Sequence, residues 1–216
     1  GLGKLGSAIV GLSAFAYVAG FVKLIAVYGA LKANWIIEFV VTQDILRAGL
    51  EPMAMVGVTG AATAYIFWSR GWVFLKILSF LAVSAMIIYI QTIPSTGFDE
   101  NWYDDHRFSR AISYYLYLLT GMLGAYSVFE IAVVKSFSVK AIAGFLLAAV
   151  FALYITPTYL GKTWAHSVVS GKNILAKVVG DQYKGESCFL LGNVNSKYLI
   201  GCLVAGNMEG FQMIEV

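Results

Sequence analysis

The chain has 216 residues, of which 59% are hydrophobic, 15% are aromatic and only 12% are charged. Soluble domains carry about 25% charged residues, so a water-soluble globule of this length could not bury this much apolar surface, and disordered chains are polar and poor in aromatics. The formal net charge of +3 comes from basic residues spread along the chain, without the clustered basic face that nucleic-acid binding needs. Composition therefore predicts a polytopic membrane protein surrounded by lipid, with no nucleic-acid partner.

Apolar segments close to the roughly 20 residues that one helical crossing of a bilayer requires recur along the chain. The first is longer than the core of a signal peptide and lacks a clear cleavage site, so we expect a retained span. Short polar turns after the second and fourth segments predict two antiparallel hairpins. The five predicted spans lie near 6–31, 50–69, 71–93, 110–134 and 138–160.

Residues 34–49 differ from the spans because charged and apolar side chains share the segment at helical spacing. With Asn34 as its N-cap, this pattern predicts an amphipathic helix that lies at the membrane interface. Two roles stay open for this helix. It is a short connection packed on the bundle, or an elbow that couples to a moving span.

The linker 94–110 carries enough charge to lie outside the membrane, and its aromatic residues favour an ordered cap at the level of the lipid headgroups. Its carboxylates suit a divalent cation, but their spacing matches no EF-hand loop, so we expect a solvated loop rather than a metal site. A histidine follows the carboxylates without the nucleophile and orienting group that catalysis requires. The candidate residues of this loop are Asp99, Glu100, Asp104, Asp105, His106 and Arg107.

After residue 161 the pattern changes to short β-like runs at 187–191, 197–204 and 211–216, separated by turn residues. They predict a small β-rich appendage outside the membrane. At about 40 residues it is too small to be stable alone, so it should dock on the bundle, on a second copy or on a partner. The predicted architecture is an all-α polytopic membrane bundle (1–161) with one interfacial helix, followed by a β-rich domain (162–216).

Five spans place the two ends of the chain on opposite sides of the membrane. Basic residues are almost balanced between the two sides, so the positive-inside rule does not decide the orientation. Lysines near the C-terminus favour a cytoplasmic position for the β-rich domain, in a bacterial inner (plasma) membrane. On that side Cys188 and Cys202 would be packing residues, whereas on the outer side they could bridge two strands.

Ionisable residues inside predicted spans are costly and mark candidate sites. Lys23 either extends its ammonium to the interface, or lines a polar cavity or meets an acidic partner. Glu130 either pairs with Lys135 or Lys76 at the interface, or faces a water-filled passage. A direct Lys23–Glu130 pair is not expected, because alternating helix directions place the two residues near opposite interfaces.

Small residues at helical spacing allow helix backbones to approach closely in lipid. Such pairs pack helices within one chain or between copies, and the second alternative predicts a homo-oligomer. The pair Ala16 and Gly20 lies in the first span. The other helix-packing candidates are Gly57, Ala61, Gly121, Ala125, Gly144 and Ala148.

The sequence contains no CxxC or HExxH spacing and no selectivity-filter signature, so we expect no catalytic residue, no metal and no cofactor. The predicted function is therefore a non-enzymatic, oligomeric, channel-like subunit that controls the permeation of ions or small solutes. The alternative is an accessory or immunity-type membrane protein that binds a partner protein. A membrane enzyme that modifies lipids is the third hypothesis.

Overall fold

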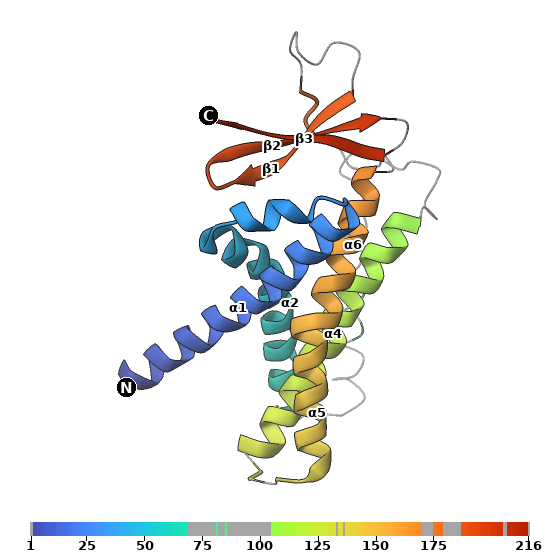
Figure 1. Ribbon diagram of the computed structural model, residues 1–216. Helices are drawn as coiled ribbons and strands as arrows, with labels where there is room; N and C mark the ends of the chain where they lie inside the picture. The colour runs from blue at the N-terminus through green and yellow to red at the C-terminus, as the bar shows by residue number, and fades with distance from the viewer. Residues whose placement is uncertain are drawn as a thin grey trace.

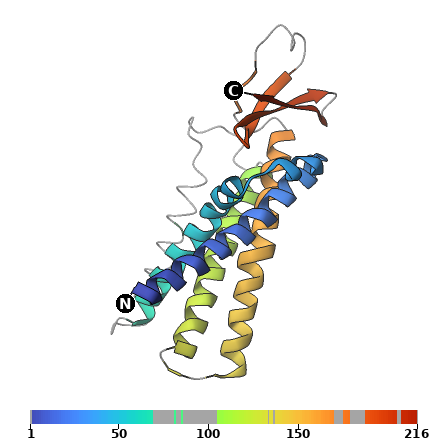
Figure 2. The ribbon, with the colours of Figure 1, turned by 60° about the vertical axis from the view of Figure 1, so that its left-hand side comes forward.

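The computed structural model describes residues 2–68, 81, 85, 105–132, 134–135, 137–169, 175–178, 187–204 and 207–215. These residues form helices that lie side by side, with a small sheet at one end (Figure 1). Helix α1 runs at an angle to the paired helices beside it (Figure 2). The elements are α1 (Leu2–Ala30), the 3-10 helix η1 (Asn34–Phe39), α2 (Thr42–Trp68), α4 (Asp105–Ala132), α5 (Val139–Val150), the π-helix η2 (Phe151–Ile155), α6 (Thr156–Val169), β1 (Ser187–Val194), β2 (Lys197–Val204) and β3 (Asn207–Glu215).

Two helical segments of the described chain, Val10–Ala30 and Val139–Val169, are long and apolar enough to cross a membrane. They correspond to the first and fifth predicted spans. Helix α4 contains a shorter apolar segment, Tyr115–Ile131, within the predicted fourth span. Apart from residues 81 and 85, the predicted third span at 71–93 lies outside the described residues.

The prediction of a separate interfacial helix at 34–49 is wrong. The extended backbone of Val40 ends the short helix η1, and α2 then begins at Thr42 and continues into the predicted second span. Asn34 is not the N-cap, which is Ala33 and makes no side-chain capping hydrogen bond. Pro52 lies inside α2 rather than at a helix start. A proline inside a helix removes one backbone hydrogen bond, a loss that membrane helices tolerate.

The fifth predicted span continues well beyond residue 160, because α5, η2 and α6 follow one another without a break to Val169. The predicted domain boundary after residue 161 therefore falls inside a helix. Ser138 caps the start of α5 by accepting a hydrogen bond from the Ala141 N–H at 3.1 Å. The π-helix lies just before Pro157, and its wider turn gives room to a residue that has no N–H and whose ring presses on the preceding turn.

The predicted β meander is confirmed. Its strands form one antiparallel sheet in the order β1-β2-β3. Asn195 and Ser196 join β1 to β2, and the positive φ angles of both residues (51° and 62°) match the type I′ turn that closes two-residue hairpins. Residues 175–178 add a short pairing to β1, where the Leu190 N–H donates to the Ala176 carbonyl at 2.9 Å.

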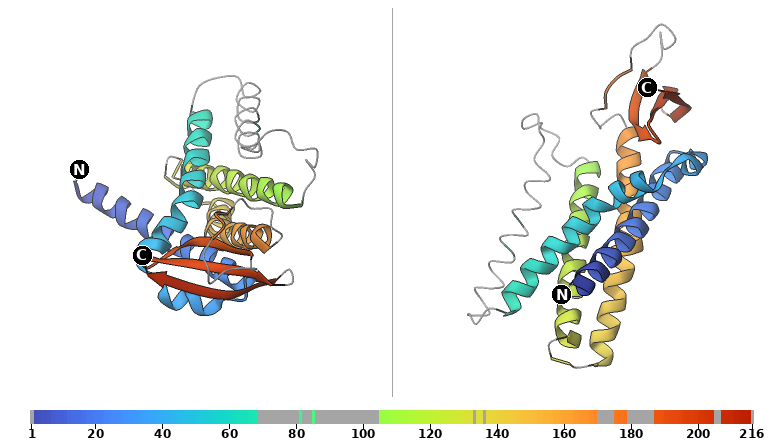
Figure 3. Two further views of the ribbon diagram at one scale, coloured as in Figure 1. Left: turned by 90° about the horizontal axis from the view of Figure 1, so that it is seen from above. Right: turned by 90° about the vertical axis from the view of Figure 1, so that its left-hand side faces the viewer.

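The sheet docks on the helices of its own chain. Seen from above, the strands lie over α1, η1 and α6 (Figure 3). Leu199 and Val194 of the sheet pack into one buried apolar cluster with Ile36 of η1 and Val168 of α6. The hairpin tip is also fixed, because the Asn195 N–H donates to the Asp44 Oδ2 atom at 3.1 Å.

Three glycines allow α1 to touch its neighbours backbone to backbone. A methyl group on Gly20 would overlap the Ile45 carbonyl of α2, and one on Gly49 of α2 would overlap the backbone of Ala16. On the other side of α1, a Cβ on Gly161 of α6 would lie 2.5 Å from the Lys23 carbonyl oxygen. These contacts bring α1 together with α2 and α6.

Candidate functional site

An ion pair joins α1 to α2 close to the glycine contacts. The Lys23 ammonium lies 2.5 Å from the Glu51 Oε2 atom. The Lys23 side chain is 17% exposed and that of Glu51 is 41% exposed, so the pair is sheltered on the lysine side and open on the glutamate side. In a sheltered environment the attraction between the two charges is stronger than it is in water.

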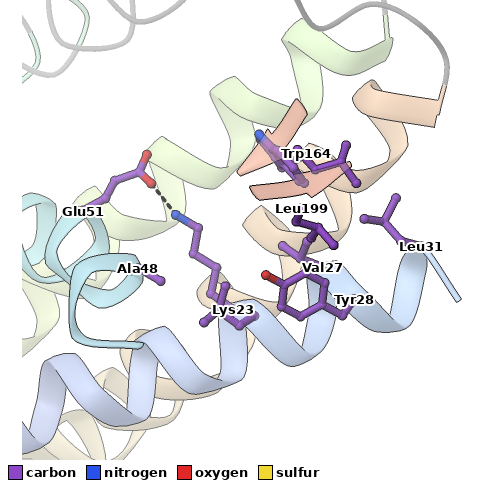
Figure 4. Close-up of a pocket in the computed structure, with 10 residues that line it drawn as sticks. Lys23, Val27, Tyr28, Leu31, Ala48, Glu51, Trp164 and Leu199 are labelled. Carbon is purple, nitrogen blue, oxygen red and sulfur yellow. Dashed lines mark hydrogen bonds and ion pairs between the residues drawn. The ribbon is translucent and has the colours of Figure 1, made fainter. Parts of the chain in front are cut away.

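The pair lies at the edge of a cavity of about 300 Å³ between the helices and the sheet. Leu191 and Leu199 of the sheet line the cavity together with Tyr28 of α1, Ala48 of α2 and Trp164 of α6. Figure 4 shows the polar ends of Lys23, Tyr28 and Trp164 on the side of the cavity that faces Glu51. The cavity is therefore amphipathic, with charged and hydrogen-bonding groups on one side and aliphatic walls on the other.

The structure gives Lys23 the acidic partner that was one of its two predicted roles. The partner is Glu51, which was not among the candidate site residues predicted from the sequence. Lys23 lies about two turns before the end of α1, and Glu51 lies between two and three turns after the start of α2. Equal depth in two successive antiparallel helices was the signal for this pair. The pair was not predicted, because the second span was expected to begin near residue 50, which would place Glu51 at the start of its helix.

Glu130 lies in the last turn of α4, a helix that ends at the end of the molecule opposite the sheet (Figure 1). It is therefore far from Lys23, as expected. Among the described residues Glu130 forms no ion pair, and the Lys135 side chain beyond the helix end is exposed. Lys76, its other predicted partner, lies outside the described residues.

The loop candidates Asp99, Glu100 and Asp104 also lie outside the described residues. Helix α4 begins at Asp105, so the backbone of Asp105, His106 and Arg107 forms its first turn and is not part of a loop. The hydrogen-bonding potential of helix N–H groups makes a carboxylate a common first-turn residue. In the part of the chain that the structure describes, no group of three or more histidine, cysteine or carboxylate residues could hold a metal ion.

The predicted packing residues divide into two groups. Gly121 of α4 lies against Thr59 and Gly60 of α2, and Gly144 of α5 lies against Ser127 of α4, where a Cβ would be 2.6 Å from the Ser127 hydroxyl. Ala148 of α5 is buried, and its Cβ would lie 3.7 Å from a Cβ on Gly124 of α4. These three residues pack helices within the chain.

The other three, Gly57, Ala61 and Ala125, line an apolar groove of about 370 Å³ between α2 and α4. Among the described residues, no atom lies within 4 Å of a Cβ built on Gly57. Gly121 lines the same groove. Spacing alone did not distinguish the glycines that contact a described helix from Gly57.

Buried hydroxyl groups on α2 and α4 donate mainly to their own helices. Thr63 donates to the Thr59 carbonyl at 2.7 Å, and Thr120 donates to the Leu116 carbonyl at 2.7 Å. Ser127 follows the same pattern. Among the residues in view, these hydroxyls are satisfied locally and do not form a polar path along the bundle.

Cys188 and Cys202 face each other across β1 and β2, with Cα atoms 4.0 Å apart, and form a disulfide. Both residues are buried, and they pack with Ile200 on the face of the sheet that points away from the helices. The bridge ties together the two strands that supply Leu191 and Leu199 to the cavity.

Comparison of this chain with protein-family models, with curated proteins and with solved structures finds no match. The inference about function therefore depends on the geometry of the chain itself.

Proposed function

We propose that the chain is an integral membrane protein and that its helices form the bundle of about five spans predicted from the sequence. The support is the outer surface of its apolar helices. Val139 is 83% exposed, Val10 is 70% exposed and Tyr154 is 64% exposed. In each of the two candidate spans less than a third of the most apolar window is buried. A helix whose apolar side chains are exposed along its length is stable when lipid surrounds it. In water, the same exposed apolar surface is unfavourable in free energy.

Within this membrane setting we propose a non-catalytic binding role. The observation that carries it is the amphipathic cavity beneath the sheet, with the Lys23–Glu51 pair on one side and aliphatic walls on the other. Binding cavities combine mostly apolar walls with a few polar groups that orient the ligand. The cavity lies where α1 and α6 end and the sheet begins, so we expect it at the membrane surface. Its ligand is therefore an amphiphile.

We also propose that the sheet faces the oxidising side of the membrane. Disulfides persist in oxidising compartments and are rare in the cytosol. The cross-strand Cys188–Cys202 bridge supports this orientation, which is the reverse of the cytoplasmic position that the lysines favoured. Labelling of free thiols in intact cells, with and without prior reduction, tests it. Free thiols in both samples would contradict it.

The predicted permeation of ions or small solutes by an oligomer stays a prediction, as do a protein partner and lipid modification. Conductance recordings in planar bilayers of pure protein test permeation. Channel events that depend on the protein would favour it over the binding role. A double substitution, Asp105→Ala with His106→Ala, that leaves every measured lipid-modifying activity unchanged would exclude these two residues as a catalytic site.

The binding role is tested by filling the cavity. We expect the wild-type protein, solubilised in detergent, to retain an amphiphile that solvent extraction and mass spectrometry detect at about one per chain. Ala48→Phe places a ring in the cavity and should remove it. Ala54→Phe is the matched control, because Ala54 is an exposed residue of the same helix. Equal retention by the two variants would contradict the proposal, and extraction of the protein from membranes by alkaline carbonate would contradict membrane insertion.

A further inference from the structure

The residues that line the cavity beneath the sheet become more buried along α1. At one end, the side chains of Lys23 and Glu51 are 17% and 41% exposed. Further along, Val27 of α1 is buried, and so is Leu31 in the turn that follows the helix. Figure 4 shows Glu51 and Leu31 at opposite ends of the residues that line the cavity. The cavity therefore has a charged mouth, where the ion pair lies, and a buried apolar far end.

The walls between the mouth and the far end are mainly apolar. Leu191 and Leu199 of the sheet lie across from Val27, and the polar ends of Tyr28 and Trp164 are turned toward the mouth. An alkyl chain placed between such walls is stabilised, because its apolar surface is removed from water. A polar head at the far end would lose its hydration among aliphatic side chains. The walls thus favour an amphiphile that enters with its chain and leaves its head at the mouth.

The length of the cavity sets how much of the chain it holds. Lys23 and Leu31 are eight residues apart, and the Leu31 N–H donates to the Val27 carbonyl at 3.0 Å, so the helical path continues to Leu31. A helical rise of about 1.5 Å per residue separates the two residues by about 12 Å along the axis. An extended chain with bond lengths near 1.5 Å and bond angles near 111° advances by about 1.25 Å per carbon. The distance from the mouth to the far end therefore matches about ten carbons.

The volume of the cavity gives the same limit by an independent route. The cavity has a volume of about 300 Å³. A methylene group occupies about as much space as a water molecule in the liquid, roughly 30 Å³, so about ten methylene groups fill the cavity. Length and volume agree only if a single linear chain is bound. The second chain of a two-chain lipid has to stay outside.

From these observations we infer that the cavity binds one linear alkyl chain of an amphiphile, tail first, to a depth of about ten carbons. The end of the chain lies against Leu31, and the polar head stays at the mouth beside the Lys23–Glu51 pair. The length of the chain, and not the chemistry of the head, selects the ligand. This inference rests on the proposed binding role. It goes further by giving the ligand an orientation and a chain length.

The test is native mass spectrometry of the full chain, purified in a rigid steroid detergent and washed free of bound amphiphiles. The protein is titrated with saturated fatty acids of six to sixteen carbons, and separately with alkyl maltosides of the same chains, at equal free concentrations. For both heads, the affinity should rise about fourfold with each methylene up to about ten carbons and then level off, with one ligand per chain. An affinity that rises steadily to sixteen carbons, or that follows the head and ignores the chain, would overturn the inference.

Two substitutions at the far end shift the limit in opposite directions. Leu31→Ala removes three carbons from the far wall, so the affinity should level off about two or three carbons later. Leu31→Phe adds volume there and should move the limit to a chain about one carbon shorter. Leu118→Ala is the matched control, because Leu118 is a buried leucine of α4 that does not line the cavity. A Leu31→Ala protein with the wild-type limit would contradict the assigned far end, and Leu31→Phe gives the same comparison if Leu31→Ala does not fold.

The two levels of the proposal fail in different ways. A protein that retains one amphiphile per chain and loses it in Ala48→Phe, yet shows no limit in chain length, would refute only the tail-first inference. A protein that retains no amphiphile on purification and binds neither series would refute the binding role as well.

Discussion

In the part of the chain that the structure describes, helix α2 borders a cavity and a groove of similar size that differ in chemistry. The cavity beneath the sheet, about 300 Å³, is lined by an ion pair and two aromatic residues as well as by aliphatic side chains. The groove between α2 and α4, about 370 Å³, is lined only by apolar residues, most of them glycine and alanine. Lipid tails or another helix can fill the groove without selectivity, whereas the cavity can orient a ligand. Polar groups, and not volume, distinguish the two hollows.

The contacts around the two hollows show a second difference. Beside the cavity, Gly20 and Gly49 bring two backbones into direct contact, whereas in the groove Gly57 meets no atom of the described residues. The largest expected effect is therefore at the first position. Gly49→Ala should destabilise the protein by about 3–5 kcal/mol, because its Cβ must displace the backbone of Ala16. Thermal unfolding in detergent, with recovery of monodisperse protein, measures the change.

Gly57→Ala is the control for that experiment. It adds the same methyl group to the same helix at a position where no described residue lies within 4 Å. An alanine in place of an exposed helical glycine stabilises by roughly 0.5–1 kcal/mol. If both substitutions had the same effect, the close approach of α1 and α2 would be wrong.

The next prediction tests whether the sheet unfolds independently of the helices. Cys188→Ser with Cys202→Ser opens a bridge with a sequence separation of 14. The expected cost is about 3 kcal/mol, since such a loop restricts the unfolded chain. Hydrogen exchange should accelerate in β1 and β2 while the described middle of α4 and of α5 stays protected. Uniform acceleration along the chain would show that the two regions unfold as one unit.

A third prediction compares two ion pairs. Lys23→Met breaks a pair whose lysine side chain is only 17% exposed, so we expect a loss of about 1–2 kcal/mol. Lys197→Met breaks a pair whose side chains are 42% and 81% exposed, and exposed pairs contribute roughly 0–1 kcal/mol. Unfolding midpoints in detergent without added lipid measure both. A larger effect at Lys197 would contradict the importance given to the cavity pair.

The smallest effect concerns pH. The hydrogen bond from Lys197, reinforced by its charge, holds the pKa of the Glu215 carboxyl below its usual value. A lowered pKa in the folded state stabilises the sheet above the pKa of the unfolded chain, and this contribution is lost as the pH falls through the folded value. The unfolding midpoint of the wild type should therefore fall slightly more between about pH 6 and pH 3 than that of Glu215→Gln. The carboxyl chemical shift of Glu215, followed against pH in the wild type and in Lys197→Gln, measures this pKa directly. Identical titration curves for the two proteins would contradict the prediction.

Much of the fold was predictable because its signals are local. Continuous apolar length predicted α1 and α5–α6, and alternating β-formers with turn residues predicted the hairpin around Asn195 and Ser196. Prolines were misleading. The spans predicted at 50–69 and 138–160 begin and end close to Pro52 and Pro157, but one proline lies inside α2 and the other follows a π-helix that accommodates it. Such positions depend on neighbouring helices, which no local pattern reports.

The candidate site was predictable only in part, because it is made of distant segments. Lys23 was identified by the cost of a charge among apolar residues. Glu51 and Trp164 could not be assigned to the same site until the start of α2 and the length of α6 were known. The disulfide was left as one of two alternatives, since the side of the membrane on which the sheet lies does not follow from the charges.

Fluorescence quenching by lipid tests the central claim most directly. The chain has five tryptophans, at positions 35, 68, 72, 102 and 164, and a variant that keeps only Trp164 reports on the cavity. Reconstituted in vesicles of phospholipid brominated near the headgroup end of its chains, this variant should be quenched strongly, because an amphiphile in the cavity brings its chain to Trp164. The quenching should weaken when Ala48→Phe is added, because the ring fills the cavity. Equal quenching with and without Ala48→Phe, or no quenching in either, would contradict an amphiphile-binding cavity at the membrane surface.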